Sequence, residues 1–184
     1  MELDRDLAFK GGRSYLHSTT LFDDIVALRG PGIREIDFRF NHKTGHQVRY
    51  KSAPPAATEV GVGIWRDNLG EFHIVERDAR ITRQEPYDED GLAAAFAFDG
   101  QHVVLPADVG GHSMVEAIVA GFKALLLRTV ADGTARLAFV RLRLRALPQL
   151  PLEIRFARRI GEFYQGDLSQ AGQPVGQVFF GEWR

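Results

Sequence analysis

Cysteine is absent from this chain of 184 residues. A disulfide framework, a thiolate metal site and a cysteine nucleophile are therefore excluded together. A long uncharged apolar run is also missing, because the most apolar stretch, residues 114–127, contains Glu116 and Lys123 and is shorter than the roughly 20 residues that span a bilayer. The first residues are acidic, which is unlike a signal peptide. We therefore expect a cytoplasmic protein that does not bind membranes.

Positive charge is concentrated in one segment. The formal net charge is −1, yet residues 123–159 hold nine basic side chains and two acidic ones. Arg141, Arg143 and Arg145 alternate along one expected strand, so their side chains project from one side of a sheet, and Arg155 belongs to the next strand. This basic face is predicted to bind an acidic partner, and a solvated strand face is the alternative. Nucleic acid is not an expected partner, because no binding motif accompanies the arginines.

The C-terminal half predicts strands around one buried helix. Residues 91–105 are apolar and predict one strand or two short ones. A helix follows over 113–128, where Ser113 is a suitable N-cap and Glu116 completes a capping box. This helix is apolar nearly all round, which predicts that it is buried. Further strands are expected at 138–145, at 152–156 with a continuation toward Tyr164, and at 175–180.

The N-terminal half repeats this order. A short strand at 7–10 precedes a helix over 16–29, and strands follow at 33–40, 47–51, 60–66 and 71–76. The residues Gly11-Gly12-Arg13-Ser14 stand 99 positions before Gly110-Gly111-His112-Ser113. Shared order and shared residues favour a duplication. We predict an α+β fold of two β-α-β-β-β-type repeats, 1–88 and 89–184, with two buried helices under a continuous antiparallel sheet.

A tandem pair of sheets wrapped around buried helices resembles a double hotdog fold. Proteins of the hotdog superfamily act mostly on acyl groups carried as thioesters of coenzyme A or of acyl-carrier protein. They include 3-hydroxyacyl-acyl-carrier-protein dehydratases, enoyl hydratases and thioesterases. The resemblance therefore implies acyl-CoA or acyl-carrier protein as the partner and no cofactor. Since one fold supports many activities, the reaction has to be argued from a site.

Three residues are the candidate catalytic groups. His102 lies fourteen positions before Glu116, the spacing of the histidine and the helix glutamate in the dehydratases that the chain resembles, although the His-Phe-Pro-Gly turn of that family is absent. In that family each site takes its histidine and its carboxylate from different halves. By the 99-residue offset, His17 is the counterpart of Glu116 and Leu3 that of His102. One site would then pair His102 with His17, and the other would hold Glu116 without a histidine.

Several interpretations stay open. Glu116 has a purely structural alternative as a capping residue, and His102 has one as a surface histidine. His42 and His46 flank an expected turn without a third ligand, so no metal site is predicted. The favoured function is acyl-thioester dehydration or hydration. A thioesterase, which needs only a carboxylate to activate water, and a non-catalytic acyl-carrier or acyl-CoA binding module are the alternatives. A homodimer is neither required nor excluded.

Overall fold

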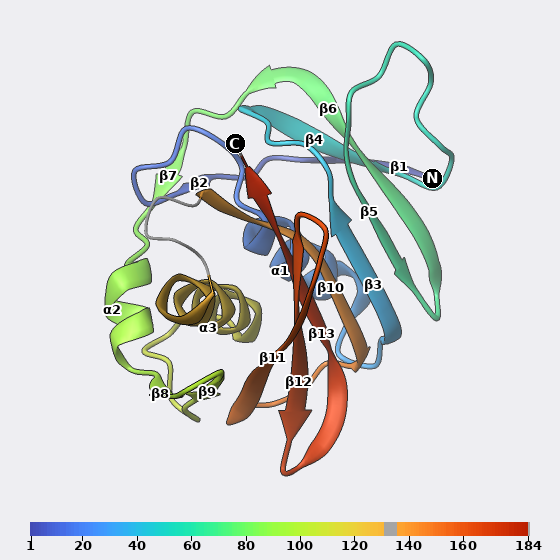
Figure 1. The fold of residues 1–184 in the computed structure, drawn as a ribbon. Helices are drawn as coiled ribbons and strands as arrows, with labels where there is room; N and C mark the ends of the chain where they lie inside the picture. The colour runs from blue at the N-terminus through green and yellow to red at the C-terminus, as the bar shows by residue number, and fades with distance from the viewer. Residues whose placement is uncertain (131–135, 184) are drawn as a thin grey trace. The chain divides into compact units, whose positions relative to one another are not determined.

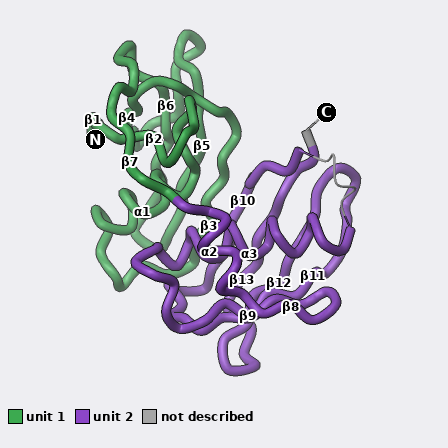
Figure 2. Tube along the Cα trace, turned by 90° about the vertical axis from the view of Figure 1, so that its left-hand side faces the viewer, with its two compact units in different colours: residues 1–87 green, residues 88–184 purple. Residues whose placement is uncertain are grey.

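The computed structural model describes residues 1–130 and 136–183. The chain divides into two compact units, Met1–Tyr87 and Asp88–Arg184, which are coloured green and purple in Figure 2. Each unit combines a long helix with an antiparallel sheet, which confirms the α+β class. The equivalence of the units as repeats stays a prediction. Within the described ranges, no helix is long and apolar enough to cross a membrane.

Unit 1 is built around one helix. Its elements in chain order are β1 (Glu2–Arg5), β2 (Phe9–Lys10), α1 (Ser18–Arg29), β3 (Arg34–Phe40), β4 (His46–Lys51), β5 (Gly61–Asp67), β6 (Gly70–Arg80) and β7 (Gln84–Glu85). The main sheet has the order β1-β4-β6-β5-β3 and is antiparallel throughout, while β2 and β7 form a separate parallel pair. The expected helix and the four strands after it are confirmed. Strand β1 was not expected, and the expected strand at 7–10 is shorter.

The core of unit 1 is aromatic. The Phe22 ring on α1 lies 5.1 Å from the Trp65 ring on β5 and 5.8 Å from the Phe38 ring on β3. All three side chains are almost completely buried. Rings at these separations, in edge-to-face or tilted geometry, stabilise a core beyond the area that they bury. These contacts fix α1 against the sheet.

A partly buried carboxylate ties α1 to β1 and β4, at the other edge of the same sheet. Asp24 on α1 accepts hydrogen bonds from Tyr50 Oη, at 2.7 Å, and from Arg5 Nε, at 2.8 Å. Burial and the Asp24 carboxylate together raise the pKa of Tyr50 well above its usual value. The hydrogen bond that Arg5 donates to Asp24 raises the pKa of the Arg5 guanidinium. The phenol of Tyr50 is therefore strongly held in its neutral form.

This arrangement predicts a loss of stability in alkali. A tyrosine titrates near pH 10 when the chain is unfolded, and the folded-state pKa of Tyr50 is higher. Its contribution is therefore complete below about pH 10 and is lost as the pH rises toward the folded-state value. We expect the free energy of unfolding, measured with urea, to fall less between about pH 9 and 11 in Tyr50→Phe than in the wild type. Parallel curves for the two proteins would contradict this prediction.

Unit 2 is built around the helix that the sequence predicted most clearly. Its elements in chain order are α2 (Glu89–Ala94), β8 (Ala97–Asp99), β9 (His102–Leu105), α3 (Met114–Thr129), β10 (Arg136–Ala146), β11 (Leu152–Ile160), β12 (Phe163–Gln170) and β13 (Gln173–Trp183). The strands of this unit follow the order β10-β13-β12-β11-β9-β8, and all their pairings are antiparallel. Figure 1 shows α3 between α2 and the strands, in keeping with its contacts to α2, β9, β11 and β13.

Two expectations for unit 2 are wrong in part. The start of the apolar segment 91–105 is helical, because Asp88 caps α2 by accepting a hydrogen bond from the Gly91 amide. The strand expected to continue toward Tyr164 instead turns at Gly161, whose φ is +59°, a value that glycine adopts readily. The chain then returns as β12, a strand that was not predicted.

Close packing holds α3 on its sheet. A Cβ atom added to Gly166 on β12 would lie 2.6 Å from the Phe122 ring of α3, and one added to Gly121 of α3 would lie 2.5 Å from Leu105 Cδ2 on β9. Phe122 and Leu105 are fully buried. The absence of a side chain at these two glycines therefore sets how closely helix and strands approach.

Candidate active site

The first turn of α3 carries the best-defined candidate. Ser113 Oγ accepts a hydrogen bond from the Glu116 amide at 3.2 Å, and Glu116 Oε2 accepts one from the Ser113 amide at 2.8 Å. The predicted capping box is thus confirmed. Both interactions satisfy amides that would otherwise lack a partner at a helix start. Capping accounts for the position of the Glu116 carboxylate.

A histidine joins this carboxylate. His112 Nδ1 lies 3.4 Å from Glu116 Oε2, and the Glu116 side chain is only 8% exposed, against 19% for His112. Positive φ angles at Gly110 and Gly111 turn the chain just before His112. Sequence reasoning missed His112 as a functional residue. The available signal was its place directly before the N-cap Ser113, next to the first turn that carries Glu116.

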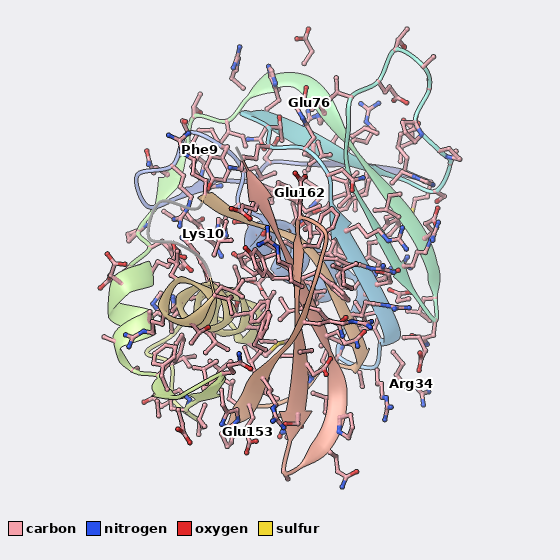
Figure 3. All side chains as sticks on the ribbon, in the orientation of Figure 1. Phe9, Lys10, Arg34, Glu76, Glu153 and Glu162 are labelled. Carbon is pink, nitrogen blue, oxygen red and sulfur yellow. The ribbon has the colours of Figure 1, made fainter. Side chains whose placement is uncertain are left out.

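His102 lies apart from this pair. On β9 the side chains of Val103 and Leu105 are buried, whereas His102 and Val104 alternate with them and point to the other face. His102 Nε2 lies 3.3 Å from Glu153 Oε2 on β11, and Glu153 is labelled in Figure 3. Since α3 packs against the face of Leu105, the structure gives His102 a carboxylate partner other than Glu116. The fourteen-residue spacing that resembles the dehydratases therefore does not correspond to a contact between His102 and Glu116.

His17 lies in unit 1 at the start of α1. It is the N-cap residue, with extended backbone and no side-chain capping bond. The N-cap of α3 is Ser113, so the helix starts are not separated by the 99 residues that relate the glycine pairs. The equivalence of His17 with Glu116 was therefore wrong at this point. His17 is nevertheless buried, and its Nδ1 lies 2.7 Å from Thr19 Oγ1.

The four arginines of the basic face differ in exposure. Arg143, Arg145 and Arg155 are exposed and Arg141 is partly buried, with its guanidinium carbon 5.9 Å from the Phe179 ring centre. Asp167 on β12 lies opposite Arg155 in the strand register. The sequence argument had found only Glu153 as a neighbouring acid. The basic face is therefore less purely positive than predicted.

Comparison with known proteins identifies the fold of this chain. No family model matches the sequence, and no curated protein matches it either. Among solved structures, the tesB protein of Mycobacterium avium subsp. paratuberculosis has a TM-score of 0.51 and 8% identity, over 96% of this chain and 91% of that one. This chain has the hotdog fold.

Other solved structures resemble this hotdog protein more distantly. The dehydratase domain of RzxB from Pseudomonas fluorescens is 15% identical, with a TM-score of 0.46, over 95% of this chain and 92% of that one. A Lactobacillus plantarum protein provisionally named an oleoyl thioesterase is 10% identical, with a TM-score of 0.45, over 100% of this chain and 94% of that one. The structural neighbours thus include both dehydratases and thioesterases, and their likeness concerns the fold alone.

Proposed function

We propose that this hotdog protein processes acyl thioesters of coenzyme A or acyl-carrier protein, and that Glu116 and His112 transfer the protons. The observation that carries the proposal is the buried carboxylate of Glu116 with His112 Nδ1 at 3.4 Å. A carboxylate removed from water and placed beside an imidazole is a proton-exchanging pair. Helix capping alone does not require the histidine.

The reaction favoured is the reversible dehydration of a 3-hydroxyacyl thioester. One group of the pair removes the proton from the carbon next to the thioester carbonyl, and the other donates a proton to the leaving hydroxyl. The carbon–oxygen bond breaks, a carbon–carbon double bond forms, and water departs. A histidine and a carboxylate in contact supply one base and one acid, and no cofactor is needed.

Thioester hydrolysis is the second candidate. It needs only a carboxylate that takes a proton from water as the water attacks the carbonyl carbon. The observation in its favour is that His102, the histidine expected to serve dehydration, has Glu153 as its partner. In this reaction the bond between carbonyl carbon and sulfur breaks and the free thiol leaves with the proton.

One set of assays separates these reactions. Purified protein is given 3-hydroxyacyl-CoA and saturated acyl-CoA substrates of several chain lengths. Dehydration is followed by the ultraviolet absorbance of the enoyl thioester, and hydrolysis by the free thiol that a disulfide reagent detects. Enoyl product without thiol supports dehydration, and thiol alone supports hydrolysis. If neither product forms while acyl-CoA still binds, the protein is a binding module.

The basic face leads to a prediction about the binding of acyl-carrier protein. Arg143 is exposed and alternates with Arg141 and Arg145 along β10, whereas Arg155 on β11 is separated from β10 by β13 and β12. Arg143→Glu should slow association with acyl-carrier protein several-fold at low salt, because opposite charges steer encounter. Raising the salt should weaken binding of the wild type. Arg34, an exposed arginine on β3 labelled in Figure 3, offers a matched control. Equal association rates for Arg143→Glu and Arg34→Glu, measured by stopped flow, would show that the face is only solvated.

A further inference from the structure

A tight turn in unit 2 leads from β9 toward α3 and ends at His112. The His112 amide donates a hydrogen bond to the Val109 carbonyl at 3.2 Å. The two residues between them, Gly110 and Gly111, have φ angles of +64° and +84°. Two consecutive positive φ angles at the centre of a β-turn are typical of type I′, which strongly favours glycine. The Gly-Gly pair thus reverses the chain directly before His112.

The side chain of Asp108 closes the first half of this turn. Its Oδ1 accepts a hydrogen bond from the Gly110 amide at 2.9 Å. An aspartate that binds the amide two residues further on forms an Asx turn, which restricts the backbone between the two residues. The residue between them is Val109, and its side chain is buried. Asp108 therefore links an anchor in the core to the glycines that turn the chain.

The other neighbour of His112 is also held in place. Ser113 is the N-cap of α3, and the capping box joins it to Glu116 by two hydrogen bonds. His112 consequently lies between two anchored residues, Val109 at the start of the turn and Ser113 at the cap. Because both are anchored, the conformation of the turn sets the direction of the Cα–Cβ bond of His112. In this conformation His112 Nδ1 lies 3.4 Å from Glu116 Oε2.

We infer that Asp108 is a positioning residue that keeps the His112 ring beside the Glu116 carboxylate. It acts through the backbone of the turn. Without the bond to Asp108, Gly110 gains access to many other backbone conformations, because glycine has no Cβ. Displacing a reacting group by about 1 Å can lower a rate by roughly a hundredfold. The effect on turnover rests on the proposed function, whereas the placement of the ring does not.

Proton NMR of the intact protein tests the placement of the ring. In the wild type we expect a nuclear Overhauser effect between the Glu116 side chain and the ring protons of His112, which are assigned by their loss in His112→Gln. Asp108→Ala should weaken this effect and speed hydrogen exchange of the Gly110 amide, because that amide loses its acceptor. Asp108→Asn keeps a side-chain oxygen that accepts the same bond, so both signals should be retained.

Turnover tests the consequence for the reaction. On the acyl thioester that the wild type converts, Asp108→Ala should lower kcat roughly tenfold with little change in KM, because the ring is displaced while the substrate still binds. Asp108→Asn should restore most of the wild-type kcat. Gly111→Ala disturbs the same turn independently and should also lower kcat. A Cβ at Gly111 meets nothing within 4 Å, so this variant acts through backbone strain and not through a clash.

Unit 2 offers a matched control for each of these variants. Asp88 Oδ1 also accepts a hydrogen bond from a glycine amide at 2.9 Å, before α2. Gly100, between β8 and β9, also has a positive φ, and a Cβ there would meet nothing within 4 Å. Asp88→Ala and Gly100→Ala make the same chemical changes outside the turn at 108–112. Both should keep the wild-type kcat and the nuclear Overhauser effect between His112 and Glu116.

Three results would overturn the inference. The first is an unchanged Overhauser effect or an unchanged kcat in Asp108→Ala. The second is a loss of kcat that Asp108→Asn does not restore, and the third is an equal loss in Asp88→Ala or Gly100→Ala. A protein that converts no acyl thioester, but in which Asp108→Ala still weakens the Overhauser effect, would instead overturn the proposed function and leave the positioning of His112 intact.

Discussion

Glu116→Gln is expected to lower kcat for acyl-thioester turnover by roughly a hundredfold or more, because it removes the group that exchanges a proton. Its free energy of unfolding should change by less than about 0.5 kcal/mol, because glutamine also serves a capping box. Activity assays and urea unfolding on the same preparation measure both quantities. The two expectations together separate proton transfer from helix capping, which use the same Oε2 atom.

Two further variants make this experiment decisive. Glu116→Ala removes the capping interaction as well and should cost about 1 kcal/mol of stability. Glu162, an exposed glutamate in the turn between β11 and β12 labelled in Figure 3, gives a control in Glu162→Gln, which should leave both kcat and stability at the wild-type values. A fully active Glu116→Gln would assign this carboxylate to capping only.

Gly166→Ala is expected to cost about 2 kcal/mol of stability, within the range for forcing atoms into a packed core. The new Cβ would lie 2.6 Å from the ring of Phe122, which is fully buried. Because Phe122 and Glu116 belong to the same helix, a displaced α3 should also lower kcat. The midpoint of urea unfolding and the turnover rate measure these effects.

Gly32→Ala provides the comparison for Gly166→Ala. A Cβ at Gly32 would meet nothing within 4 Å, and its backbone does not adopt a positive φ. This variant should be neutral or slightly more stable, because alanine restricts the unfolded chain. If the two variants had equal stability, the contact between Gly166 and Phe122 would not control the packing of α3.

Much of the fold was predictable from the sequence, in segments where the local pattern is compatible with only one secondary structure. The helix after Ser113 has a capping box and an apolar surface nearly all round, and the structure shows both the helix and the box. The alternation of arginines with apolar residues around Arg143 likewise gave β10. In these segments, local hydrogen bonding and burial favour the same structure.

The elements that were not predicted lie where the local sequence is compatible with more than one secondary structure. Residues 91–94 are glycine, leucine and two alanines, a composition that is compatible with a buried strand or a short helix. The hydrogen bond between the Asp88 side chain and the Gly91 amide favours the helix. Strand β12 was not predicted, because Gly166 and Asp167 interrupt the alternation of its apolar residues. Gly166 has its explanation only in the ring of Phe122, which is distant in sequence.

The candidate site was predictable in part. Glu116 was found from its spacing to Ser113, whereas the approach of His112 depends on the two glycine turns before it. His102 was assigned by its spacing to Glu116 alone, and spacing does not state which face of a strand a side chain occupies. The alternation of Val103 and Leu105 as buried residues decided that point.

The end strands β1 and β8 also have a consequence for association between copies of this chain. A terminal strand presents backbone groups to which a foreign strand can add, as in aggregation. Here β8 has only three residues, Ala97–Asp99, and β1 is four residues long with Glu2, Asp4 and Arg5 among them. Short length and charge both oppose strand addition, so these two ends are poor templates for fibrils.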